Sequence, residues 1–403
     1  MEESTVGPME NVTDYDYDFE FDDYNQHIVV AIAFSMASIL GIIGNSLVIL
    51  SVYVSKKLRT VTNAFVVNLS IADLITSLMI PWNVTILLSH EEYPIKDWGC
   101  GVVAGLLFTC IGTSLFTLSF IALNRLILIT RPMKTYITVY SPFYTGIWIA
   151  ATWVIPFCFN IIPPLLDVGE LGTSQKYRMC VGISKHPDKD TYDLIQLVGC
   201  FPIPLVTLIV SYTWIYIHLR RHAQRLNHHR SYREANSGAD SLNMSESGTL
   251  TNTVGTLPQS NDNNNMNNVG TTNDLSRSIR SISQRLTSVI IRPDKLRKAE
   301  KQRRKRENTI TKNMFLVFIA FVVCFVPTAL QLALDGIDGI KAMVPYATAL
   351  ILINACVNPI IYGFKHPYFN HVFRCLLTCK WHAIPEPSDG FKKFRNLCCR
   401  FGR

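Results

Sequence analysis

Seven long stretches with almost no charged residues constrain the fold of this chain more than any other feature. They cover residues 27–54, 63–88, 100–124, 143–164, 191–219, 313–334 and 342–364. Stretches of about 20 apolar residues are long enough to cross the hydrocarbon core of a bilayer as helices. Only 17% of the 403 residues are charged, which argues against a soluble enzyme and against a disordered chain. The sequence therefore predicts an all-α fold, a bundle of seven transmembrane helices.

The basic residues predict the orientation of this bundle. Of the 38 Lys and Arg residues, 32 fall in the loops and tail on one side of the predicted membrane and six fall on the other. Because basic residues concentrate on the cytoplasmic side, we expect a multi-pass protein of the plasma membrane with an extracellular N-terminus and a cytoplasmic C-terminus. Residues 1–26 lack the basic and apolar regions of a cleavable signal peptide, so the first span is expected to act as its own insertion signal.

The spans divide the chain into five predicted parts. These are an acidic extracellular tail at 1–26, spans one to five at 27–220, a cytoplasmic loop at 221–307, spans six and seven at 308–364, and a cytoplasmic helix and tail at 365–403. The middle of the long loop is rich in Ser, Thr, Asn and Gly, a composition typical of disorder. Its basic end, residues 292–306, fits either a membrane-lipid surface or a docking surface for a cytoplasmic partner.

The predicted topology sorts the 11 cysteines. Cys100 and Cys180 are the two that it places at or near the oxidising face, so we predict a disulfide between them. Cys375 and Cys379 follow the seventh span on the cytoplasmic side and are candidates for palmitoylation. Asn11 begins an Asn-Val-Thr glycosylation motif in the predicted extracellular tail.

One carboxylate, that of Asp73, falls in the middle of a predicted span. An acid at this depth is costly and is treated as functional by default. Other spans offer polar side chains at a similar depth, namely Asn45, Ser114, Asn354 and Asn358. A carboxylate among neutral oxygens suits a small hard cation such as sodium, whereas the alternative is a hydrogen-bonded cluster that ties helices together.

The spacing of several motifs resembles that of class A (rhodopsin-like) G-protein-coupled receptors. The motifs span the chain: Gly44-Asn45, Leu69 to Asp73, Cys100, Asn124-Arg125-Leu126, Trp153, Pro156, Pro204, Tyr212, Cys324 to Pro327, and Asn358-Pro359-Ile360-Ile361-Tyr362. Within the class the chain looks most similar to the set of melatonin receptors, moody and trapped-in-endoderm. The resemblance implies a seven-helix receptor with a short amphipathic helix after the seventh span.

The resemblance also implies roles for individual residues. Arg125 is expected to hold the cytoplasmic face shut, paired with Glu307, and then to contact a heterotrimeric G protein. The remaining switch residues are Tyr212, Asn358, Pro359 and Tyr362, and the implied sodium pocket comprises Asp73, Ser114, Asn354 and Asn358. Arrestin and receptor kinases are further implied partners. The chain departs from the family pattern at Asn124 (usually Asp), Leu126 (usually aromatic) and Phe325 (usually Trp).

The resemblance narrows the class of extracellular ligand. Leu107 stands where amine receptors place an aspartate, and Leu352 stands where opsins place the retinal lysine, so neither ligand is expected. The candidate pocket is mostly apolar with a few neutral polar groups, which suits a lipid, an indole-like amide or the apolar end of a peptide. Its predicted residues are Asn83, Val103, Leu107, Phe108, Ile111, Gln196, Phe325, Thr328 and Thr348.

Two other functions remain open at this point. The mid-membrane acid Asp73 is compatible with a transporter, and the altered Asn124-Arg125-Leu126 motif is compatible with a decoy receptor that does not signal. The chain carries no P-loop, nucleophile elbow or HExxH motif, so we expect no enzymatic activity. We expect no cofactor other than a possible sodium ion, and no nucleic-acid partner.

Overall fold

The computed structural model of the chain describes residues 23–89, 96–174, 177–182, 186–221, 224, 293–333 and 343–393. The predicted glycosylation site at Asn11 and most of the predicted loop at 221–307 lie outside these residues. The chain divides into two units, one comprising Met1–Ile215 with Thr311–Arg403 and the other comprising Tyr216–Ile310.

Among the described residues, seven helices are long and apolar enough to cross a membrane. They are α1 (Tyr24–Val54), α2 (Val61–Leu88), α3 (Asp97–Thr130), α5 (Pro142–Asn160), the segment Lys189–Arg221, the part Thr309–Leu330 of α10 (Pro293–Ala333), and α12 (Val344–Lys365). Short helices α4 (Met133–Val139) and α6 (Ile162–Leu165) flank α5. The predicted all-α, seven-helix fold is confirmed.

Local chemistry explains where several of these helices begin and break. The Asp23 carboxylate caps α1 by accepting a hydrogen bond from the backbone N–H of Asn25 at 2.9 Å, and the Thr60 hydroxyl caps α2 in the same way. The fifth span is interrupted at Phe201, between α7 (Lys189–Cys200) and a second helical stretch at 202–221. Pro202 follows Phe201 and has no backbone N–H to donate, which accounts for the break.

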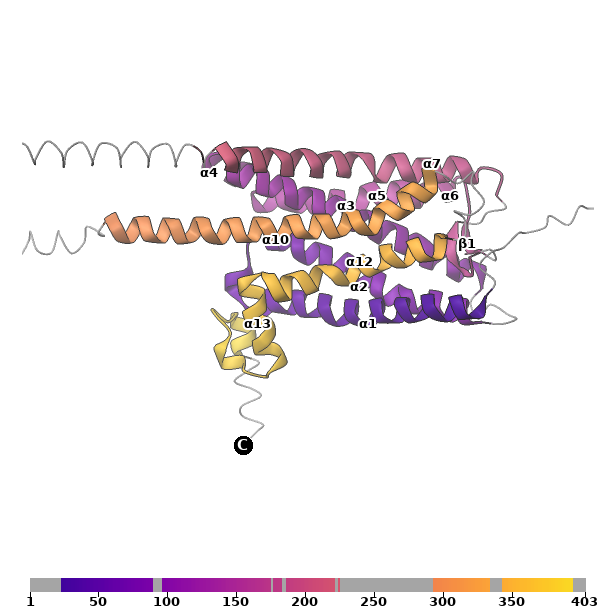
Figure 1. Ribbon diagram of the computed structural model, residues 1–403, viewed down its shortest axis with the longest axis horizontal. Helices are drawn as coiled ribbons and strands as arrows, with labels where there is room; N and C mark the ends of the chain where they lie inside the picture. Colours follow the sequence, from indigo (N-terminus) through magenta and orange to yellow (C-terminus); the bar gives the residue numbers. More distant parts are fainter. Residues whose placement is uncertain are drawn as a thin grey trace, which may run out of the picture. The chain divides into compact units, whose positions relative to one another are not determined.

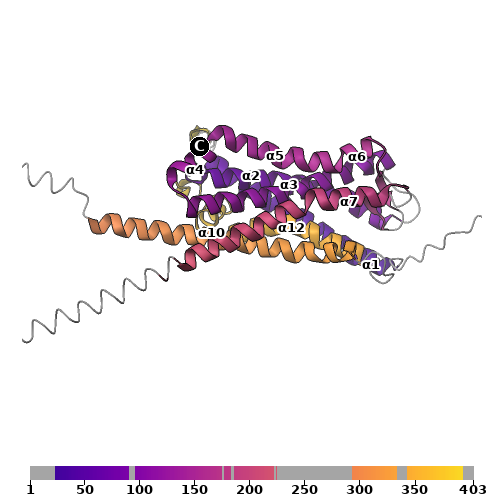
Figure 2. The ribbon, with the colours of Figure 1, turned by 90° about the horizontal axis from the view of Figure 1, so that it is seen from above.

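Within the first unit, α1 packs against both α2 and α12, α2 packs against α3, and α3 packs against α5 (Figures 1 and 2). Small residues allow the close approach of α1 to its neighbours. A Cβ atom at Gly44 would lie 2.6 Å from Cγ of Pro359 on α12, and one at Gly41 would overlap the Ser77 hydroxyl on α2. Such contacts are typical of helix packing in membranes, where van der Waals fit replaces the hydrophobic effect.

A two-stranded antiparallel hairpin lies on one end of α3. It is formed by β1 (Leu171–Ser174) and β2 (Met179–Gly182), with Thr173 opposite Cys180. Cys180 is bonded to Cys100 in the first turn of α3, so the predicted disulfide is confirmed. The end of the bundle that carries this hairpin is called the hairpin end below.

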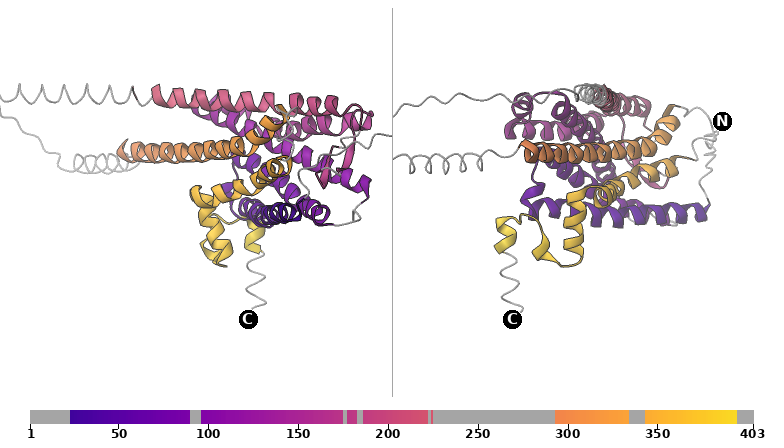
Figure 3. Two further views of the ribbon diagram at one scale, coloured as in Figure 1. Left: turned by 45° about the vertical axis from the view of Figure 1, so that its right-hand side comes forward. Right: turned by 60° about the vertical axis from the view of Figure 1, so that its left-hand side comes forward.

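At the opposite end of the bundle, the chain turns from α12 into α13 (Pro367–Leu377), as Figures 1 and 3 show. This helix is the one expected after the seventh span, and its presence is confirmed. The buried His366 caps it, because Nδ1 of the imidazole accepts a hydrogen bond from the Phe369 backbone at 3.4 Å. We call this end the tail end.

Beyond α13 and the short turn η2 (Trp381–Ala383), residues 384–391 return to the tail end of α1. The backbone N–H of Ser388 donates to the carbonyl of Val54 at 2.8 Å, and that of Lys56 donates to the carbonyl of Glu386 at 2.8 Å. Ile384 and Phe391, at the two ends of this segment, are buried. Residues 384–391 are called the tail strap.

In the second unit, the described residues are two helical pieces. One is the end of the fifth span from Tyr216, and the other is the part of α10 from Pro293 to Ile310. The basic run at 292–306 is therefore helical from Pro293 onward, and the predicted boundary between residues 307 and 308 falls inside one continuous helix.

Candidate functional site

A cavity of about 550 Å³ lies among the third, fifth and sixth spans. Its walls are mostly apolar, with aromatic rings contributed by Phe108, Phe201, Phe321 and Phe325. The rings of Phe321 and Phe325 are stacked with their centroids 4.0 Å apart, and Phe201 lies 5.8 Å from Phe325. A site of this size and apolar character fits a small organic ligand.

The polar wall of the cavity is built where the end of α5 meets the start of α7. The Gln196 amide nitrogen donates to Oδ1 of Asn160 at 2.9 Å and to the hydroxyl of Tyr192 at 2.7 Å. Asp193 also lines the cavity, and its Oδ2 atom lies 2.7 Å from the ammonium of Lys189. The cavity therefore joins a broad apolar surface to a short stretch of neutral and charge-paired polar groups.

Five of the nine predicted ligand residues line this cavity: Phe108, Ile111, Gln196, Phe325 and Thr328. The other four, Asn83, Val103, Leu107 and Thr348, do not line it. Val103 and Leu107 are buried in the apolar core beneath the hairpin. Leu107 directly precedes Phe108 in the sequence. Because each residue of a helix is rotated by about 100° from the one before it, neighbouring positions on α3 face different surroundings.

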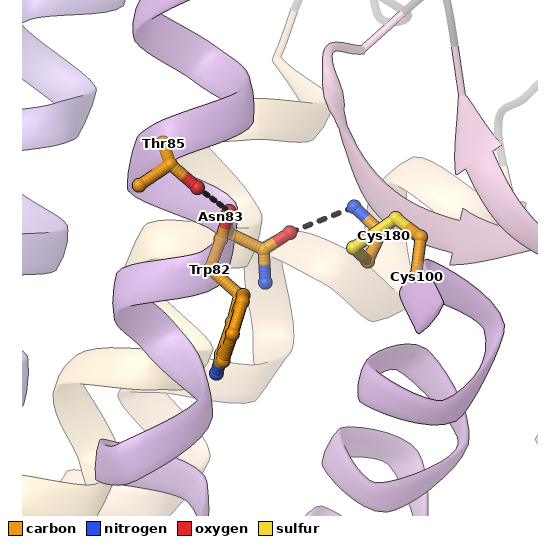
Figure 4. The surroundings of a disulfide bond; sticks show 5 residues. All are labelled: Trp82, Asn83, Thr85, Cys100 and Cys180. Carbon is orange, nitrogen blue, oxygen red and sulfur yellow. Dashed lines mark hydrogen bonds between the residues drawn. A yellow bond between two sulfur atoms is a disulfide. The ribbon is translucent and has the colours of Figure 1, made fainter. Parts of the chain in front are cut away.

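Asn83 holds the hairpin in place rather than facing the cavity. Its Oδ1 atom accepts a hydrogen bond of 2.7 Å from the backbone N–H of Cys180, so the amide stands directly beside the disulfide (Figure 4). A second bond links the Arg178 guanidinium to the carbonyl of Ser89 at 2.9 Å. Both contacts tie the hairpin to the end of α2.

The Asp73 carboxylate lies in a buried polar cluster between α2, α3 and α12. Its Oδ1 accepts from the Ser114 hydroxyl at 2.7 Å and its Oδ2 accepts from the Asn358 amide at 2.7 Å. The structure therefore brings together three of the four residues of the predicted sodium pocket. The fourth, Asn354, is buried on α12.

Several side-chain oxygens on α1 and α12 have no hydrogen-bond partner within the described part of the chain. They include Oδ1 of Asn45, Asn354 and Asn358, all of which are buried. Buried acceptors without donors are costly, and a small cation prefers carboxylate, hydroxyl and amide oxygens. The residues present at Asp73 thus fit a sodium ion as well as a hydrogen-bonded cluster.

At the tail end of α3, Asn124 and Arg125 are both buried. The Asn124 amide accepts from the Thr62 hydroxyl at 2.7 Å and donates to the Tyr136 hydroxyl at 3.2 Å. An uncharged residue thus links α3 to α2 and α4. Leu126 is half-buried beside this pair.

Two tyrosines predicted to belong to the switch lie near the same end. Tyr362 is fully buried and stacks on Phe369, and Tyr212 stacks on Phe318 of α10.

Three further residues of interest lie near the tail end or on α10. Burial and the positive charge of Arg125 lower the pKa of His366 to about 4. Pro359 is buried against Gly44. Glu307 lies on α10, but its side chain is outside the described part of the structure.

The two candidate palmitoylation cysteines differ in exposure. Cys379 is exposed, whereas Cys375 is only 4% exposed, with its sulfur 3.8 Å from Nε2 of His371. An acyl chain needs an accessible thiol, so the structure favours Cys379 over Cys375.

Sequence reasoning identified Gln196 but missed the partners that orient it. Asn160 and Tyr192 lie in different spans and are 32 residues apart, and the bond from the Tyr192 hydroxyl to the Asn160 carbonyl is 2.8 Å long. The one available signal was a polar residue in the last turn of one span and another in the first turn of the next. That signal does not say that the two side chains meet.

The chain is similar to known proteins over most of its length. The chain is 25% identical over 348 residues to the G-protein coupled receptor moody of Drosophila melanogaster, covering 85% of this chain and 50% of that protein. It is 25% identical over 356 residues to melanopsin-B of Xenopus laevis, covering 86% of this chain and 54% of that protein. The chain thus spans about half the length of these relatives.

The crystal structure of squid rhodopsin has a similar fold, with a TM-score of 0.63 at 19% identity, covering 90% of this chain and 89% of that one. The family model for the seven-transmembrane receptors of the rhodopsin family matches residues 44–362, which contain α2, α3, α5, α7 and nearly all of α12. Its match covers well over half of the sequence. The chain therefore belongs to the rhodopsin family of seven-transmembrane receptors.

Proposed function

We propose that this protein is a receptor that binds an extracellular ligand at the hairpin end and activates a heterotrimeric G protein at the tail end. The observation that carries the proposal is that one helix, α3, lines the cavity with Phe108 and Ile111 and presents the buried Arg125 at its other end. The sixth span likewise carries Phe325 in the cavity wall and Phe318 against Tyr212. Ligand binding is therefore able to bias the packing around Arg125 through rigid helices.

The orientation of the receptor is part of the proposal. The bias of Lys and Arg residues toward the tail end supports a cytoplasmic location for that end. The disulfide at the hairpin end supports an extracellular one, since disulfides persist in oxidising compartments. Arrestin and receptor kinases are further proposed partners at the tail end, and the plasma membrane is the proposed location.

The experiment that tests coupling is nucleotide exchange on a promiscuous G protein, in membranes that contain the full chain, across an unbiased ligand library. We expect ligands that raise GTPγS binding in the wild type and lose this effect in Arg125→Ala, while still binding. Ligand uptake without nucleotide exchange would favour a transporter, and ligand binding without either response would favour a decoy receptor.

Asp73 is proposed to bind sodium in the inactive state. The support is its buried position beside Ser114 and Asn358, together with the Oδ1 atom of Asn358, which accepts no hydrogen bond from the described residues. Because the ion binds one state better, it should lower agonist affinity, and by linkage agonist should lower sodium affinity. Asp73→Asn is expected to abolish this sodium effect, and an unchanged sodium response in that variant would contradict the site.

Arg125 and Glu307 are proposed to form the latch that restrains basal activity. Asn124, the residue before the arginine, is uncharged and is engaged by Thr62 and Tyr136, so this position supplies no carboxylate. Asn124→Asp is expected to lower ligand-free nucleotide exchange and Glu307→Ala to raise it, each by about fivefold for an interaction of about 1 kcal/mol. If neither changed ligand-free exchange at matched surface expression, the latch would be located elsewhere.

A further inference from the structure

The hydrogen bonds around Gln196 determine which of its two polar atoms is left for a ligand. The orientation of the Asn160 amide is set by the backbone carbonyl of Pro156, which can only accept a hydrogen bond. The Asn160 amide nitrogen donates to this carbonyl at 2.7 Å. The other end of the Asn160 amide, Oδ1, is therefore the acceptor that faces Gln196, at 2.9 Å.

Tyr192 adds a second constraint. A tyrosine hydroxyl has one proton, and this one is donated to the backbone carbonyl of Asn160 at 2.8 Å. The same hydroxyl must then accept from the Gln196 amide nitrogen, which lies 2.7 Å away. Both N–H groups of Gln196 are thereby used, and its Oε1 atom has no protein partner among the described residues.

The other polar groups of the cavity are consistent with an uncharged ligand. The Asp193 carboxylate already lies against the Lys189 ammonium at 2.7 Å, so it does not require a cationic partner. On the sixth span, the Thr328 hydroxyl oxygen is buried without a hydrogen-bond partner in the described part of the chain. The remaining side chains that line the cavity are mainly aliphatic and aromatic.

We propose that the cavity selects an uncharged amphiphile that donates a hydrogen bond, through a hydroxyl or amide N–H, to Oε1 of Gln196, and places its apolar body against Phe108, Phe201 and Phe325. This rests on the proposed ligand-binding function of the cavity. The Thr328 hydroxyl on the sixth span is a second polar contact. Asn160 and Tyr192 are positioning residues, because they act on the ligand only through the orientation of the Gln196 amide.

A matched pair of probes tests the proposal: N-octylbenzamide, which has one N–H donor, and octyl benzoate, in which oxygen replaces that N–H. Binding of each is measured from the thermal unfolding of the purified full chain in lipid nanodiscs, without G protein. We expect the amide to bind the wild type roughly tenfold more tightly than the ester, as for one well-made hydrogen bond. In Gln196→Leu the ratio should fall close to one, whereas in Gln26→Leu, the same change outside the cavity, it should stay at the wild-type value.

Tyr192→Phe provides a second variant that preserves the shape of the wall. It removes the acceptor for one Gln196 N–H, which allows the amide to turn, so the preference for the amide probe should weaken while affinity for the ester is kept. Equal binding of the two probes by the wild type, binding of neither, or an amide preference that survives Gln196→Leu would each overturn the proposal. Probe binding with these ratios but without nucleotide exchange in any assay would refute the proposed coupling to a G protein and leave the ligand class intact.

Discussion

The hairpin and the tail strap are both short segments held across one end of a helix, but they are held by different chemistry. The hairpin is fixed to α3 by the Cys100–Cys180 disulfide and to α2 by the buried Asn83 amide. The tail strap is fixed to the end of α1 and the residues just after it by backbone hydrogen bonds and by an exposed ion pair between Lys56 and Asp389 at 2.7 Å. A covalent clamp suits the proposed extracellular side, and a non-covalent one suits the reducing cytoplasm.

The surroundings of two glycines show how differently the hairpin and the tail strap pack against their neighbours. A Cβ atom at Gly101 would lie 2.7 Å from the carbonyl oxygen of Leu171 in the hairpin, whereas one at Gly390 in the tail strap would lie 3.3 Å from the Tyr53 hydroxyl. The first neighbour is backbone, which cannot easily move, and the second is the far end of a side chain. We therefore expect the hairpin end to be rigid and the tail end to be the more easily opened of the two.

The largest expected effect comes from removing the covalent clamp. Cys100→Ser should lower the free energy of unfolding by about 2–5 kcal/mol, because the disulfide closes a long loop. Thermal unfolding of the purified protein in nanodiscs would measure this loss. Cys158→Ser, which alters a free cysteine on α5, is the control, and equal unfolding midpoints for the two variants would contradict a structural role for the disulfide.

Lowering the pH should destabilise the tail end through protonation of His366. Its pKa is lowered from 6.5 to about 4 in the folded protein, so its contribution to stability is complete above pH 6.5 and is lost as the pH falls toward 4. The loss amounts to at most about 3 kcal/mol. His366→Asn keeps an acceptor for the cap of α13 and has no titrating group at this position. The unfolding midpoint of this variant should therefore change less with pH over this range than that of the wild type. Identical pH profiles for the two proteins would show that His366 is not the group responsible.

The close contact between α3 and the hairpin predicts a smaller loss of stability. Gly101→Ala should destabilise the protein by about 1–3 kcal/mol, as for overpacking against a fixed neighbour. Gly182→Ala is the control, because Gly182 lies in the hairpin itself and a Cβ atom there would meet its nearest neighbour at 3.9 Å. This substitution should leave the stability nearly unchanged. The difference between their unfolding midpoints is the measurement, and a difference of zero would mean that the hairpin can shift off α3 without cost.

The smallest effect is expected at the tail strap. Lys56 lowers the pKa of Asp389 below its usual value, so this ion pair is present at neutral pH and is lost as acid protonates Asp389. Asp389→Asn should speed amide hydrogen exchange in residues 384–391 slightly, and added salt should shrink the difference, because the pair is exposed. Asp188→Asn, an exposed acid at the hairpin end, should leave this exchange unchanged. Equal exchange in wild type and Asp389→Asn at low salt would mean that the ion pair does not hold the strap.

Much of the fold could be predicted because its determinants are local or follow from topology. Length and hydropathy along the chain indicate each span, and the location of Cys100 and Cys180 on one side of the membrane leaves them as partners for each other. The meeting of Asp73 with Ser114 and Asn358 followed from the family resemblance, because those motifs stand at matching positions in three spans.

The contacts that give the candidate site its selectivity were decided only by the tertiary structure. The amino-acid pattern placed Asn83 in the pocket, yet its amide binds the hairpin backbone, and nothing local joined Asn160 to Tyr192 or the tail strap to Val54. The physical reason is that hydrophobicity determines which segments enter the membrane, whereas the tilt and rotation of each helix determine which of its side chains face one another. Those angles are set by packing against neighbours that are distant in the sequence, and an error of one residue turns a side chain by about 100°.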